Sequence, residues 1–161
     1  MIKPLRQRPL DLFLFAFYCI ALANGLLMSL PESLGVPVTA DSPWPPLQWL
    51  YGWAVAEEPA HLLVPQPAYL HTAALLDGWI HAPFIVVLLH ALWMGSNWIR
   101  PWALLFAGSA VTNMLYYLMA TFSDPAFSPP HTVFYLCMNL PWMLVPMLLA
   151  WRLRKHRPFE A

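Results

Sequence analysis

The chain has 161 residues, of which 60% are hydrophobic and 10% are charged, and its formal net charge is zero. This composition predicts an integral membrane protein and excludes nucleic-acid binding, because phosphate contacts need a basic surface. Cys19 and Cys137 lie in apolar runs without metal-ligand spacing, so we expect no disulfide framework, no metal and no cofactor.

Four apolar stretches are long enough to cross a bilayer, which takes about 20 predominantly apolar residues. The first is longer than the apolar centre of a signal peptide, and we expect it to be retained. These stretches predict an all-α, four-transmembrane-helix bundle that forms a single domain over residues 1–161. The expected helices are residues 10–30, 69–94, 101–122 and 131–151.

The long loop 31–67 differs from the helices around it. It contains eight prolines, which forbid one continuous helix, and several tryptophans, which suit the membrane–water interface. Residues 46–63 predict a short interfacial helix across the mouth of the bundle. Glu58 would then lie near that mouth, either as a ligand contact or as an exposed loop end; the two alternatives stay open.

All Lys and Arg residues fall before the first helix, at Arg100, or after the fourth helix, whereas the other connections carry only acidic charges. With four helices, these three places share one side of the membrane. The positive-inside rule therefore predicts that both termini are cytoplasmic and that loop 31–67 is not. The membrane is a bacterial cytoplasmic membrane or the endoplasmic reticulum; the charges do not distinguish them.

The second helix carries Asp77 and His81, which are four residues apart and so share one helical face. Pro83 lacks a backbone N–H and leaves the carbonyl of Trp79 without its helical partner. Ionisable groups at membrane depth usually face a bundle interior or a wet cavity. The pattern predicts an intramembrane cavity; the alternative is a helix whose polar groups are satisfied by its neighbours.

Other helices offer polar groups to the same interior. Ser109, Asn113, Tyr116 and Tyr117 form one stripe on the third helix, and Asn24 lies on the first. The fourth helix carries Asn139 and Trp142 beside two prolines that should bend it. Cavity lining and hydrogen bonding between helices explain this stripe equally well.

This set of groups suits two tasks. One is binding a lipid or an amphipathic amine, with a carboxylate as counter-ion and aromatic faces around the cation. The other is proton transfer on a hydrophobic substrate, with Asp77 and His81 as the catalytic pair of a double-bond isomerase. A third alternative is a membrane interaction subunit without a ligand. The sequence has neither a phosphate-binding glycine loop nor an H-E-x-x-H motif.

Several motifs together resemble the EXPERA superfamily, which includes the emopamil-binding protein, a sterol isomerase, and the sigma-2 receptor. They are FYLCMNLPWMLVP in the fourth helix, WIRPWALL between the second and third, LLDGWIHAPF in the second, and Glu58-Pro59 in the long loop. The resemblance implies a pocket for a sterol-like or terpenoid lipid, with Asp77 near the ligand amine. It also implies that Asn139 and Trp142 line the pocket.

The first helix departs from these relatives. The isomerase has a His and a Glu four residues apart there, and the receptor has an acid near the helix end, whereas this chain offers Asn24 and Ser29. We therefore expect an incomplete isomerase acid set on a conserved binding scaffold. The resemblance, with glycines such as Gly25, Gly78 and Gly108 as close-approach surfaces, predicts a homodimer. The expected ligand-binding residues are Asn24, Glu58, Asp77, His81, Asn113, Tyr117, Asn139 and Trp142.

Overall fold

A computed structural model describes residues 3–57, 68–123, 125 and 129–159, and the side chains of residues 53–57 are not part of that description. The described chain is helical and contains no strand. Four helices are long and apolar enough to cross a membrane, which confirms the predicted fold class. They span Pro9–Ser33, Ala68–Met94, Asn97–Ser123 and Thr132–Arg152, within a few residues of the predicted bounds at both ends.

Three of these spans are interrupted near a proline. The first consists of α1 (Pro9–Asn24), a π-helical turn (Gly25–Ser29) and α2 (Leu30–Ser33). The second consists of α4 (Ala68–Leu76), a π-helical turn (Asp77–His81) and α5 (Ala82–Met94). The fourth breaks at Leu140 between α7 (Thr132–Asn139) and α8 (Pro141–Arg152), as its prolines predicted.

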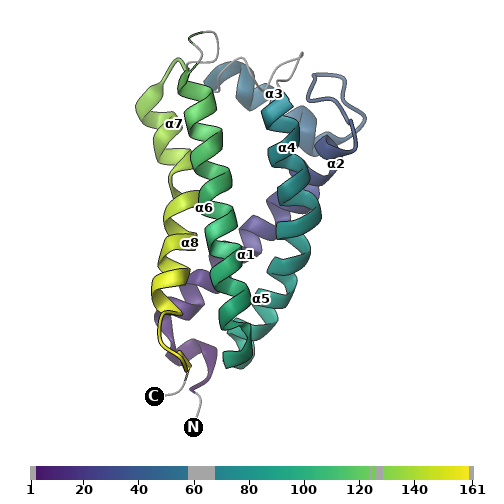
Figure 1. Ribbon diagram of the computed structural model, residues 1–161. Coiled ribbons are helices and arrows are strands. Elements are labelled where there is room, and N and C mark those ends of the chain that lie inside the picture. Colours follow the sequence, from purple (N-terminus) through teal and green to yellow (C-terminus); the bar gives the residue numbers. More distant parts are fainter. Residues whose placement is uncertain (1–2, 58–67, 124, 126–128, 160–161) are drawn as a thin grey trace.

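The third span is regular: a short 3-10 turn (Asn97–Ile99) leads into α6 (Arg100–Ser123), which packs along α8. Both described ends of the chain lie at the same end of the bundle (Figure 1). At the other end, α3 (Pro45–Glu57) lies across the tops of the spans (Figure 1), which confirms a short helix in the long loop as far as residue 57. Residues 58–63 of the predicted helix lie outside the described residues.

The first span extends beyond its predicted end at residue 30. Pro31 has no N–H to give to the carbonyl of Leu27, the acceptor four residues earlier. The indole N–H of Trp44, from the loop before α3, donates to that carbonyl oxygen at 2.7 Å. The helix therefore continues to Ser33, and Glu32, expected in the loop, belongs to the membrane helix and is buried.

The bundle is densely packed in the half that carries the termini. Its core joins the start of α1 to α5, the start of α6 and the end of α8, through Leu14, Tyr18, Ile85, Leu88, Leu92, Ile99, Ala103, Phe106 and Leu149. Large apolar side chains on the outside of the same helices, such as Phe13, Val86 and Leu105, are exposed. That arrangement suits a surface that faces lipid rather than water.

Two glycines allow the two π-helical turns to pack backbone against backbone. A Cβ atom added to Gly78 would lie 2.9 Å from the Cα atom of Leu30, and one added to Gly25 would lie 3.0 Å from the Cβ atom of Ala82. These glycines therefore serve contacts within the chain rather than a dimer surface. Gly95 ends α5 in a left-handed conformation at φ 68°, and Gly108 has no atom within 4 Å of its added Cβ.

The glycine contacts give the first prediction. Gly78→Ala forces the added methyl group against the backbone of Leu30, and overpacking of this kind costs about 1–3 kcal/mol. We expect a lower melting temperature for the variant than for the unchanged protein, measured on the purified protein in detergent.

Gly108→Ala is the matched control, because it makes the same chemical change inside a membrane helix with open space around it. It should leave the melting temperature unchanged or raise it, since Ala favours helix over Gly. Equal melting temperatures for the two variants would contradict the close crossing of the two π-helical turns.

Candidate functional site

A cavity of about 260 Å³ lies in the half of the bundle away from the chain termini. Every span contributes to its wall, and so does Leu50 of α3. Most lining groups are apolar, including small residues of α4 such as Ala73 and Ala74. The polar lining residues are Tyr18, Asn24, Ser29, Glu32, Asp77, His81, Asn113, Tyr117 and Asn139.

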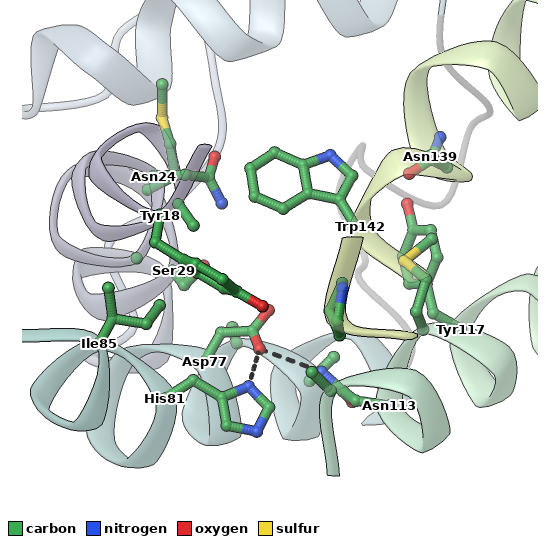
Figure 2. Close-up of a pocket in the computed structure, with 18 of the residues that line it drawn as sticks. Tyr18, Asn24, Ser29, Asp77, His81, Ile85, Asn113, Tyr117, Asn139 and Trp142 are labelled. Atoms are coloured by element: carbon green, nitrogen blue, oxygen red, sulfur yellow. Dashed lines mark hydrogen bonds and ion pairs between the residues drawn. The ribbon is translucent and has the colours of Figure 1, made fainter. Parts of the chain in front are cut away.

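Asp77 is the centre of the polar wall, as Figure 2 shows. Its Oδ1 atom accepts a hydrogen bond from Nδ1 of His81 at 2.8 Å and another from Nδ2 of Asn113 at 3.2 Å. No described residue donates to Oδ2, and the Asp77 side chain keeps 40% of its surface exposed. One carboxylate oxygen is therefore fixed by the protein, and the other is available in the cavity.

His81 is held at both ring nitrogens. A carboxylate can only accept, so Nδ1 donates to Asp77, and in the neutral ring Nε2 accepts from the hydroxyl of Ser109 at 2.9 Å. The edge of the ring also contacts Phe106 at 5.2 Å between centroids. His81 is buried, and these contacts fix its orientation beneath the carboxylate, where it positions Asp77.

The π-helical turn explains how Asp77 reaches the cavity. Asp77 is the first residue of that turn and His81 is the last, so the pair stays on one face although the helix widens between them. Two residues later Pro83 cannot donate to the carbonyl of Trp79, and the wider turn precedes that gap. The indole N–H of Trp79 donates to Ser33 Oγ at 3.0 Å and ties this span to the end of the first.

The structure brings seven of the eight predicted site residues to the cavity wall: Asn24, Asp77, His81, Asn113, Tyr117, Asn139 and Trp142. Glu58 lies outside the described residues. Asn24 is exposed at the edge of the cavity, and the Trp142 indole points into it (Figure 2). The amide of Asn139 donates to the carbonyl of Tyr135 at 2.9 Å, so it also serves its own helix.

The third-helix stripe is split between two tasks. Ser109 and Asn113 bind His81 and Asp77, and Tyr117 lines the cavity. Tyr116 is exposed and turns away toward Tyr69, with the two rings 6.2 Å apart edge to face. The stripe thus lines the cavity and also forms hydrogen bonds between helices, the two roles that the sequence predicted equally well.

Among the polar residues of the cavity wall, sequence reasoning missed Glu32 and Tyr18. Glu32 was assigned to the loop because a proline such as Pro31 usually marks the end of a helix. The structure instead places Glu32 in the first span, where it is buried and lines the cavity. The first span therefore does carry an acid near its end. Tyr18 was one aromatic residue in an apolar run and gave no periodic signal. Its side chain points into the cavity (Figure 2), and no described residue bonds its buried hydroxyl.

Residues 54–153 match the family described as EXPERA (EXPanded EBP superfamily). The chain belongs to this family. The match covers the end of α3 and the last three spans, and it confirms the resemblance drawn from the sequence motifs. No curated protein is significantly similar to the chain. The matched region of this EXPERA protein contains six of the predicted site residues: Asp77, His81, Asn113, Tyr117, Asn139 and Trp142.

The unbonded hydroxyl of Tyr18 gives the second prediction. Tyr18→Phe removes a buried polar group that has no described partner, so the unliganded protein should keep its stability or gain up to about 1 kcal/mol. The measurement is the melting temperature in detergent without added lipid.

Tyr135→Phe is the matched control on a residue that is equally buried. The Tyr135 hydroxyl is 3.3 Å from Oγ1 of Thr121, whose own proton goes to the carbonyl of Tyr117. Its loss should cost about 1 kcal/mol. If Tyr18→Phe lowers the melting temperature as much as Tyr135→Phe, the Tyr18 hydroxyl has a partner in the unliganded protein.

Proposed function

We propose that the protein binds the polar end of a sterol-like or terpenoid lipid, or of an amphipathic amine, in this cavity. The observation that carries the proposal is Asp77: a carboxylate at membrane depth with one oxygen fixed and the other open to an apolar cavity. A charged group inside a membrane is costly, and a ligand that pairs with it offsets that cost. The proposed contacts are Asn24, Asp77, His81, Asn113, Tyr117, Asn139 and Trp142, together with Glu58, which lies outside the described residues.

The volume of the cavity suits the polar end of an amphipathic ligand rather than a whole ligand. Pockets that enclose a drug-sized ligand usually measure roughly 300–1,000 Å³, and this one measures about 260 Å³. It would hold a polar head with part of a ring system, and the remaining apolar body would extend toward the lipid. The rings of Phe17 and Trp142, 5.3 Å apart, provide aromatic faces on the wall.

A double-bond isomerase is the second candidate, favoured by the 2.8 Å contact between Asp77 and His81. The reaction would add one proton to an end of a ring double bond and remove another from the allylic carbon. Asp77 Oδ2 is the group placed to hold that proton, and His81 would act through Asp77. Since both His81 nitrogens are engaged within the protein, the geometry favours binding over direct proton transfer by the imidazole.

The third prediction compares two ligands that differ in one group: a sterol with a 3-hydroxyl group and the same sterol with a 3-amine. Hydrogen bonds to charged groups contribute about 1.5–3 kcal/mol, so Asp77→Asn should weaken amine binding by roughly ten- to hundredfold. Binding of the hydroxyl sterol should change little. Native mass spectrometry of the purified protein measures both.

Asp41→Asn is the matched control, because it makes the same change at an exposed loop acid outside the cavity. The isomerase is tested in the same samples by incubating an unsaturated sterol in D₂O and measuring deuterium incorporation. Deuterium gain that Asp77→Asn abolishes would establish the isomerase. If Asp77→Asn weakens neither ligand, Asp77 is a structural acid and the proposed site is wrong; absence of all binding would favour the interaction subunit.

We also propose that both termini are cytoplasmic, that loop 31–67 lies on the opposite side, and that the protein is a homodimer. The shared position of the termini at one end of the bundle supports the first two statements (Figure 1). For the fourth prediction, a reporter fused at Ala161 should read as cytoplasmic and one within loop 31–67 as external. A cytoplasmic signal from the loop would reverse the assignment, and cross-linking that yields only monomer would remove the homodimer.

A further inference from the structure

A second cavity, of about 280 Å³, lies at the end of the bundle where both chain termini lie. The segment before α1, the first turn of α1 and the C-terminal tail form its wall together. The lining residues are Lys3, Gln7, Arg8, Pro9, Leu10, Asp11, Arg152, Pro158 and Phe159. None of them lines the first cavity, so this is a separate site.

The charge of this cavity is positive. Among the described lining residues, three are cations (Lys3, Arg8 and Arg152) and one is an acid (Asp11), a surplus of two positive charges. Asp11 accepts from Arg8 at 2.9 Å and from two nitrogens of Arg152 at 2.7 Å and 3.0 Å. A guanidinium has five N–H donors, and Arg152 gives one further bond to the carbonyl of Pro158, so donors remain for another acceptor.

The two arginines are held rigidly around the C-terminal tail. The ring of Phe159 lies 5.3 Å from the guanidinium carbon of Arg8 and 5.2 Å from that of Arg152. Arg8 also donates to the carbonyl oxygens of Leu92 and Trp93, at 2.7 Å and 3.1 Å. These contacts fix the cations before any ligand arrives, which lowers the entropic cost of binding.

The start of α1 adds to the attraction for an anion. Pro9, Leu10 and Asp11 are its first residues and all line the cavity, and no side chain caps this helix end. The partial positive charge of a helix N-terminus favours anions. Arg8 directly precedes the first span and Arg152 ends the fourth, so a bilayer that covers the four spans would have its headgroups near this cavity.

We propose that this cavity binds the phosphate group of an anionic phospholipid of the phosphatidylglycerol type. Basic pockets between membrane helices recognise such headgroups through their surplus positive charge. The apolar side chains of Leu12 and Phe13, which are exposed on α1 next to the cavity, give the acyl chains a surface to lie along. A soluble phosphate ion would use the same donors and would leave that surface uncovered.

The test is a native mass-spectrometry titration of the purified protein with dioleoylphosphatidylglycerol and with dioleoylphosphatidylcholine. Both lipids carry a phosphate, and only the first is anionic overall. We expect tighter binding of phosphatidylglycerol. Lys3→Gln should weaken it by about fivefold, because one Lys or Arg near a membrane surface contributes about 1 kcal/mol.

Arg6→Gln is the matched control: Arg6 is an exposed cation of the same segment that does not line the cavity. It should leave phosphatidylglycerol binding unchanged. Equal affinity for the two lipids, or equal weakening by Lys3→Gln and Arg6→Gln, overturns the site in favour of diffuse attraction. Displacement of phosphatidylglycerol by millimolar inorganic phosphate assigns the cavity to a free anion and overturns the lipid.

Discussion

The arrangement of the bundle depends on the close crossing of two π-helical turns, Gly25–Ser29 and Asp77–His81. Each turn is followed two residues later by a proline, Pro31 or Pro83, which cannot continue the regular hydrogen-bond ladder. A membrane helix must satisfy its backbone groups internally, and the wider turns absorb the interruption. Gly25 and Gly78 then let the two backbones approach. Asp77 immediately precedes Gly78, so this crossing also places the acid of the site.

Asp11 and Asp77, two of the acids in the described membrane spans, have different partners. Asp11, 1% exposed, is neutralised by two arginines that use both of its oxygens, and it joins the first span to the last. Asp77 is bonded through Oδ1 to a histidine and an amide, neither of which is a permanent cation. The first arrangement joins two spans through both carboxylate oxygens, whereas the second leaves the Oδ2 atom of Asp77 without a hydrogen bond from any described residue.

Much of this fold follows from the sequence because the bilayer imposes a length. The four apolar runs predicted the four membrane helices, and the positions of the Lys and Arg residues agreed with that number of helices. The spacing of Asp77 and His81 predicted the centre of the candidate site. Glu32 was not predictable, because a proline normally marks a helix end, and only the indole of distant Trp44 replaces the lost hydrogen bond. Tyr18 and the glycine contacts depend on which helices meet, and neither composition nor periodicity contains that information.

The uneven packing of the bundle has a consequence for its motions. The half that carries the termini contains fully buried apolar side chains, among them Leu14, Leu88, Leu92, Ile99 and Leu149. The other half surrounds the first cavity. Local opening needs the least free energy where buried apolar contacts are fewest. Hydrogen exchange should therefore be fastest around α3 and α7 and slowest beside the chain ends, the reverse of the usual pattern of fraying from the termini. The half around the cavity can thus open while the contacts of Arg8, Asp11 and Arg152 keep the first, second and fourth spans together.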